Sequence, residues 1–131
     1  MKELKVRSRF REEMIDITEE IEKFVREEEL RNGFIVLYVP HTTAGLVINE
    51  GFDPDVSKDL IEILKRLIPK DGNYRHAEGN SDAHIKSAIL GESKIIPVKD
   101  GRLLLGTWQR VFFFEGDGPR NRRVILGAIH S

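Results

Sequence analysis

The feature that most constrains the fold is a change of pattern along the chain near residue 93. Before it, helical patterns alternate with short apolar runs. After it, residues 94–98, 102–114 and 122–129 have strand character, with turn signals at Asp100-Gly101 and at residues 116–119. This order predicts one α+β domain over residues 1–131, with a mixed or antiparallel sheet, helices packed on it and a final antiparallel meander.

The N-terminal part predicts two short strands, a helix and a third strand. Alternating residues predict a half-exposed strand over 6–11 and a second over 14–17. Thr18 is expected to cap a helix that ends at Asn32-Gly33. The unbroken apolar run over 34–39 predicts a strand buried on both faces.

Two further helices are expected in the middle of the chain. Asp53 and Pro54 form a start signal for the first, which carries an apolar stripe and stops at Pro69. Asn80 or Ser81 can cap a short helix that ends before Gly91. Its inward face is expected to carry Ile85, Ala88 and Ile89.

Composition excludes several classes of function. The 21 Lys and Arg residues nearly cancel the 22 Asp and Glu residues, so nucleic acid is not an expected partner. The absence of cysteine excludes disulfides, thiolate metal sites and a cysteine nucleophile. No signal-peptide core or membrane-length apolar segment is visible, which predicts a cytoplasmic protein without a membrane partner.

The first candidate binding segment follows the apolar run at 34–39. It reads Pro40-His41-Thr42-Thr43-Ala44-Gly45, and the two threonine hydroxyls with nearby backbone amides could bind phosphate oxygens. It lacks the glycine spacing and the Lys-Ser/Thr pair of a Walker loop. The alternative is a turn with an exposed histidine.

The second candidate segment, residues 76–84, combines two histidines, two carboxylates and Asn80. His84, in the first turn of a helix, could point back toward His76 across the Gly79 turn. With His41 added, three histidines and an open fourth position would suit a catalytic divalent metal such as zinc. The alternative is an ordinary hydrogen-bonded loop, because the spacing matches no established zinc pattern.

Several carboxylates are candidate catalytic groups. Asp82 has a competing explanation, because a carboxylate in a first turn suits the helix dipole. Neither Glu78 nor Glu50 is explained by helix capping, and Glu50, beside Asn49, is a candidate acid/base or partner of a ligand histidine. We therefore group Glu50, Asn49, Glu78 and Asp82 as the candidate catalytic set.

The third candidate segment contains Trp108, the only tryptophan, beside Gln109. The pair could contact a heteroaromatic ring, although core packing is the favoured alternative for the indole. Arg120 could hold phosphate, with a solvated turn as the alternative. Asn80, Trp108, Gln109 and Arg120 thus join Thr42 and Thr43 as candidate substrate- or anion-binding residues.

Together, these segments resemble the YjbQ family. The matching residues run from His41-Thr42-Thr43-Ala44 through Asn49-Glu50 and the stretch 76–86 to Gly106-Thr107-Trp108-Gln109 and Asp117-Gly118-Pro119-Arg120. The resemblance implies an α+β homotrimer with polar residues near a subunit boundary and histidines that bind a metal ion. It also implies secondary thiamine-phosphate synthase activity, which joins hydroxymethylpyrimidine diphosphate to thiazole phosphate and releases pyrophosphate.

On this reading the metal on the three histidines would neutralise the departing diphosphate. Thr42, Thr43 and Arg120 would hold phosphate, and Glu50 or Asp82 would manage protons or ligand orientation. Two alternatives remain. One is a metal-dependent phosphate-ester hydrolase, and the other is a non-catalytic trimer that binds a metal or a phosphorylated metabolite.

Overall fold

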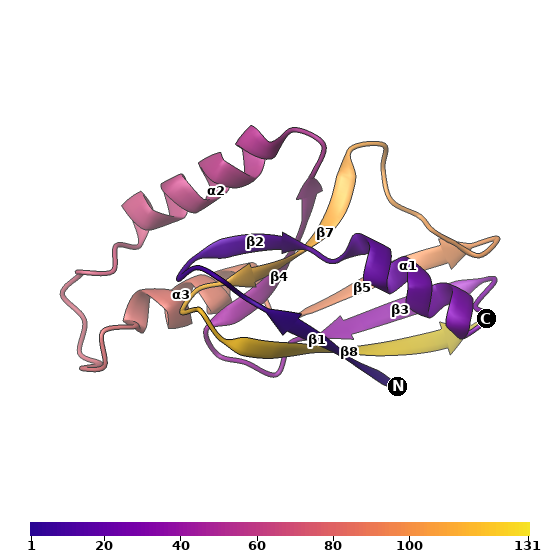
Figure 1. The fold of residues 1–131 in the computed structure, drawn as a ribbon, viewed down its shortest axis with the longest axis horizontal. Helices are drawn as coiled ribbons and strands as arrows, with labels where there is room; N and C mark the ends of the chain where they lie inside the picture. Colours follow the sequence, from indigo (N-terminus) through magenta and orange to yellow (C-terminus); the bar gives the residue numbers. More distant parts are fainter.

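The computed structural model describes residues 1–131 and has an α+β architecture built on two antiparallel sheets (Figure 1). One sheet contains five strands: β1 (Lys2–Arg7), β3 (Gly33–Tyr38), β5 (Ser93–Lys99), β6 (Arg102–Leu103) and β8 (Asn121–His130). The other contains three: β2 (Glu13–Asp16), β4 (Ala44–Glu50) and β7 (Gln109–Glu115). Their orders are β1-β8-β3-β5-β6 and β2-β7-β4. The expected α+β class is confirmed.

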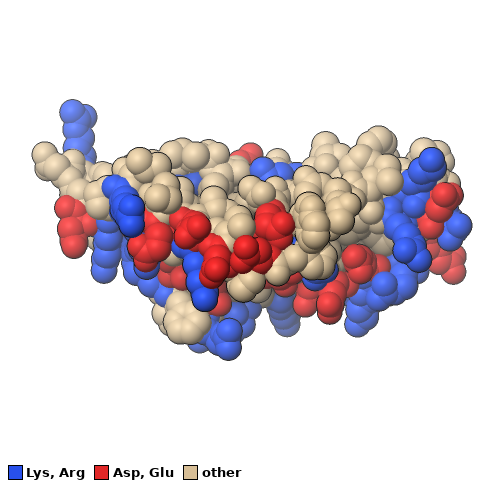
Figure 2. Space-filling view, turned by 90° about the horizontal axis from the view of Figure 1, so that it is seen from above, with Lys and Arg blue, Asp and Glu red and all other residues tan.

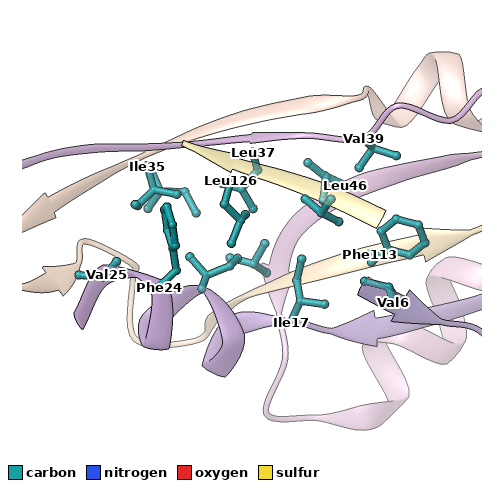
Figure 3. Packing of buried hydrophobic residues seen from close by; sticks show 14 of the residues in the cluster. Val6, Ile17, Phe24, Val25, Ile35, Leu37, Val39, Leu46, Phe113 and Leu126 are labelled. Carbon is teal, nitrogen blue, oxygen red and sulfur yellow. The ribbon is translucent and has the colours of Figure 1, made fainter. Parts of the chain in front are cut away.

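The hydrophobic core lies between the two sheets and helix α1 (Thr18–Glu27). Phe24 of α1 points toward Ile35 of β3, and Val25 is also part of the core (Figure 3). Leu46 and Phe113 of the smaller sheet lie at the opposite end of the core (Figure 3). The core cluster contains 17 buried residues, none of which comes from the other two helices. Those two helices therefore lie outside this hydrophobic core.

Helix α1 differs from the prediction at both ends. Ile17 occupies the N-cap position, while the side chain of Asp16 accepts a hydrogen bond from the Thr18 amide at 2.9 Å. The expected end at Asn32-Gly33 was wrong, because the helix ends at Glu27 and Glu29 adopts a φ of 50°. This turn brings Leu30 back into the core.

The first strand also differs from its predicted bounds. It ends at Arg7, because Ser8 turns inward and donates a hydrogen bond to the buried carboxylate of Glu115 at 2.7 Å. Strand β4 was not predicted as a strand, since its polar and glycine residues obscured the pattern. Gly45 allows a close approach there, because a Cβ atom would lie 3.0 Å from the carbonyl oxygen of Gly91, a tight contact.

Strand β3 is buried on only one face, so the prediction of burial on both faces was wrong. Ile35 and Leu37 enter the core, whereas Phe34 and Tyr38 are exposed on the other face. Ile95 of β5, which pairs with Val36, is 64% exposed on the same sheet. The five-stranded sheet thus presents an uncovered apolar face.

The predicted C-terminal meander was also wrong. The β5–β6 hairpin at Asp100-Gly101 is confirmed, but residues 104–108 interrupt the predicted strand, and β7 belongs to the other sheet. Within this turn, the Gln109 side chain accepts a hydrogen bond from the Gly106 amide at 2.8 Å. Strand β8 inserts between β1 and β3, which are far from it in sequence.

Helix α2 (Pro54–Leu67) begins as predicted and lies on the outside of the fold, near β2 (Figure 1). The Asp53 side chain accepts a hydrogen bond from the Asp55 amide at 3.0 Å, which confirms the N-cap. None of the residues of α2 is fully buried. Its apolar stripe is therefore largely unpartnered in the single chain.

Helix α3 (Ser81–Leu90) buries the opposite face from the one that the sequence predicted. Its buried face carries Asp82, Lys86 and Ser87, whereas the predicted inward residues Ile85, Ala88 and Ile89 are exposed. The Ser87 hydroxyl donates to the carbonyl of Ala44 on β4. Polar contacts, rather than an apolar stripe, fix the orientation of this helix.

Charged side chains of both signs are interspersed over the face shown in Figure 2. Neither sign covers this face, in keeping with the net charge of −1. None of the three helices combines the length and apolar character needed to cross a lipid bilayer.

Candidate functional site

His76 and His84 meet at the N-terminal end of α3, as the sequence predicted. Their ring centroids are 5.4 Å apart and the rings are nearly perpendicular. His84 is on the helix, while His76 lies on the preceding loop, and Gly79, with a φ of 79°, provides the turn between them. The pair faces an open pocket of about 550 Å³, lined also by Tyr74, Arg75, Ser81 and Ile85.

Asn80 links the histidine pair to a second polar cluster. Its Oδ1 lies 3.0 Å from His76 Nε2, and its Nδ2 donates to Asp117 Oδ2 at 3.0 Å. Arg120 donates to the same Asp117 oxygen at 3.1 Å, which brings this predicted anion-binding residue close to the histidines. Burial alone would raise the pKa of Asp117, but the hydrogen bonds from Asn80 and Arg120 lower it. Asp117 therefore stays ionised and orients both partners.

Asp82 is fully engaged inside the protein rather than free in the pocket. The Arg11 guanidinium donates to both of its oxygens, at 3.0 and 3.2 Å, and Lys86 donates to Oδ2 at 2.9 Å. Burial would raise the pKa of Asp82, but these hydrogen bonds outweigh it and hold the pKa below its usual value. The role that this geometry allows is positioning of α3, with Lys86 also paired to Glu12.

His41 is not part of the pair. It lines a separate pocket with residues of β1 and β8, and its Nε2 accepts a hydrogen bond from the Arg123 amide at 3.0 Å. Burial, reinforced by the neighbouring Arg122 and Arg123 charges, lowers the pKa of His41. The imidazole is thus neutral, with its Nε2 lone pair occupied by the backbone of β8.

The two candidate threonines have different environments. Thr43 is buried, and its hydroxyl accepts a hydrogen bond from Arg122 at 2.7 Å. Its carbonyl accepts one from the Gly116 amide at 2.9 Å. Thr42 is exposed and remains accessible to a ligand. In this arrangement Thr43 fixes the loop that carries His41 and Thr42.

The remaining candidates gather around the paired ends of β4 and β7. Glu50 accepts hydrogen bonds from the amides of Phe52 and Asp53 at 2.6 and 2.9 Å, so it does have a local structural role in the turn before α2. Trp108 is 62% exposed, so core packing does not explain it. Its ring contacts Phe52 edge-on at 5.9 Å. Gln109 pairs with Glu50 in the ladder, beside Asn49.

The donor set around the histidine pair suits a divalent ion only in part. Two imidazoles are present, and Glu78 Oε2 lies 3.7 Å from His76 Nε2. No group of three His, Asp or Glu side chains in the single chain is arranged to hold a metal ion. Nitrogen and carboxylate ligands are those that zinc accepts when thiolates are absent.

Sequence reasoning missed Arg11, Arg75 and Ser81. Arg11 comes from the N-terminal loop and reaches Asp82 across 71 positions of sequence, so no local pattern signals it. Arg75 directly precedes His76, and its position beside the histidine-rich segment was the available signal. For Ser81 the sequence predicts only a possible helix cap.

These features define an α+β protein with a histidine pair and a cluster of hydrogen-bonded polar side chains at one helix terminus. The chain belongs to the UPF0047 protein YjbQ-like family, whose model matches residues 2–131.

Relatives and solved structures agree with this assignment. UPF0047 protein MJ1081 of Methanocaldococcus jannaschii is 53% identical over 95% of this chain and 90% of its own length. UPF0047 protein YugU of Bacillus subtilis is 47% identical over 93% of both chains. The crystal structure of a YjbQ/UPF0047 family protein from Clostridium acetobutylicum superposes with a TM-score of 0.97 at 44% identity, covering 98% of this chain and 100% of that one.

Proposed function

We propose that this protein is a thiamine-phosphate-synthase-type transferase. It couples hydroxymethylpyrimidine diphosphate to a thiazole phosphate at the His76–His84 site and requires a divalent metal ion, with zinc as the first choice. In the reaction, the thiazole nitrogen bonds to the methylene carbon of the pyrimidine. The bond from that carbon to the diphosphate oxygen breaks, and diphosphate leaves with the electron pair.

The observation that carries this proposal is the His76–His84 pair beside a cluster of fixed charges. Asn80 joins His76 to Asp117, and Asp117 in turn orients Arg120. A bound divalent ion would offset the negative charge that develops on the leaving diphosphate. Arg120 and the unpaired Arg75 would add fixed positive charge for phosphate oxygens.

The proposed active form is a homotrimer. The uncovered apolar face of the five-stranded sheet and the absence of buried residues on α2 both support association with further copies. His41 lies in a different pocket from the histidine pair, so a three-histidine site would need His41 from a neighbouring copy. Trp108 and Gln109 also lie outside the pocket of the histidine pair. They would therefore contact the heteroaromatic ring of the substrate from a neighbouring copy.

The test is product analysis with the two thiamine precursors and a divalent metal. Wild-type protein should form one pyrophosphate for each thiamine phosphate. The His130→Ala control should turn over at the same rate as the wild type, because His130 is exposed. Replacing His76 with alanine should lower turnover by about hundredfold or more, because the negative charge that develops on the departing diphosphate would lose its stabilising partner.

Two outcomes would contradict the transferase. Release of inorganic phosphate from phosphate esters, without a coupled product, would identify a metal-dependent hydrolase. Saturable binding of metal and phosphorylated metabolites without turnover would identify a non-catalytic binding trimer.

A further inference from the structure

The N-terminus of α3 is uncapped, unlike that of α2. At α2 the Asp53 side chain accepts a hydrogen bond from a first-turn amide. At α3 the corresponding residue is Asn80, whose side chain makes no bond to the helix because it is held by His76 and Asp117. The amides of Ser81 and Asp82 consequently donate to no group of the chain. Two free donors point out of the helix end.

A second observation at the same place is the Ser81 hydroxyl. Ser81 is only 6% exposed, and its Oγ is the one buried side-chain polar atom in the chain without a hydrogen-bond partner. Buried hydroxyl groups are normally paired, and an unpaired one is unfavourable. Ser81 lines the pocket that also contains the histidine pair, so a ligand in that pocket could supply the missing partner.

The charges around the pocket favour an anion. The positive end of the helix dipole and the unpaired Arg75 lie at its wall. The negative charge of Asp82 is offset by Arg11 and Lys86. Asp117, which Asn80 links to His76, is paired with Arg120. Glu78 is the carboxylate near the histidines that has no Lys or Arg partner, and it is mostly exposed to solvent.

We propose that the first turn of α3 binds a phosphate group of the substrate. The amides of Ser81 and Asp82 and the Ser81 hydroxyl donate to its oxygens, and Arg75 adds a charged contact. This assignment rests on the proposed function for the identity of the substrate. It goes further by stating that the phosphate is held by the helix terminus itself, independently of any metal.

Inorganic phosphate is the probe, added to the full-length protein after dialysis against a chelator. Amide chemical shifts of ¹⁵N-labelled wild-type protein should change saturably at Ser81 and Asp82, while the capped amide of Asp55 on α2 should not respond. Ser81→Ala should weaken phosphate binding by about tenfold, the loss of one hydrogen bond to a charged group. Ser57→Ala, a matched serine near the N-terminus of α2 with no side-chain hydrogen bond, should bind like wild type.

The proposal is overturned if phosphate leaves the Ser81 and Asp82 amides unchanged, or if binding occurs only after metal is restored. It is also overturned if Ser81→Ala binds as tightly as the Ser57→Ala control. These results are independent of turnover, because metal-free protein can bind phosphate even if the transferase activity is absent. Wild-type shifts require no substitution, so a poorly folded variant does not prevent the test.

Discussion

Replacing Glu115 with glutamine should strongly destabilise the protein. Both side chains of the Glu115–Arg122 pair are buried. Arg122 donates to both carboxylate oxygens, at 2.8 and 2.5 Å, and Ser8 and the Asp117 amide donate to the same carboxylate at 2.7 and 3.0 Å. These contacts join the N-terminal loop, the end of β7 and the start of β8.

The substitution leaves the Arg122 charge buried without a compensating charge. The NH2 group of the glutamine would also face hydrogen-bond donors at a position where a carboxylate oxygen now accepts them. Removing one partner of a buried pair costs about 3–5 kcal/mol. This is a large fraction of the ~5–15 kcal/mol that stabilises a typical domain. Glu115→Gln should therefore unfold at a much lower urea concentration than the wild type.

The matched control is Glu3→Gln. Glu3 pairs with Arg123 at 3.3 Å between the adjacent strands β1 and β8, but both side chains are about half exposed. Exposed pairs contribute less than about 1 kcal/mol. Urea unfolding followed by circular dichroism, at one protein concentration, measures both variants. Equal free energies of unfolding for the two variants would refute the reasoning.

Two further predictions concern pH and assembly. Burial and the adjacent Arg122 and Arg123 lower the pKa of His41 from 6.5, so the unfolded chain binds more protons and stability should fall as pH drops below that value. His41→Gln should reduce this fall in stability. Free energies of unfolding, measured by urea titration above and below pH 6.5, would contradict the prediction if they fell by the same amount in the variant and the wild type. Ile95→Glu should dissociate the proposed trimer in analytical ultracentrifugation without loss of circular dichroism signal, because this side chain is already exposed in the single chain; an intact trimer would exclude that face.

Local signals in the sequence predicted the features that depend on neighbouring residues. Asp53-Pro54 marked the start of α2, and Asp100-Gly101 marked the β5–β6 turn. The approach of His84 to His76 also followed from a short segment, because a helix start and a glycine turn determine it. Such features need no knowledge of the remaining chain.

Long-range contacts determined what sequence reasoning missed. The buried face of α3 is polar because Asp82 and Lys86 bind Arg11 and Glu12, which lie more than seventy positions away. No helical periodicity reveals such partners, so the apolar face was assigned to the inside. Strand order was hidden for the same reason, since β8 pairs with both β1 and β3.

The candidate site was predicted as one set of residues but lies in three places. Glu50 and Trp108 are near the paired ends of β4 and β7, and His41 is beside β8. Only the segment around His76 and Asn80, joined by Arg120 through Asp117, forms a compact cluster in the single chain. Sequence patterns indicate which residue types carry chemistry, but their convergence depends on tertiary and, as we propose, quaternary contacts.

The most direct test of the central claim is the metal content of the purified protein. Wild type and His130→Ala should retain a divalent metal in a fixed ratio to the chain, while His76→Ala and His84→Ala, folded by circular dichroism, should lose it. Equal metal content in all four proteins, or no metal in any of them after reconstitution, would contradict a metal site at the His76–His84 pair.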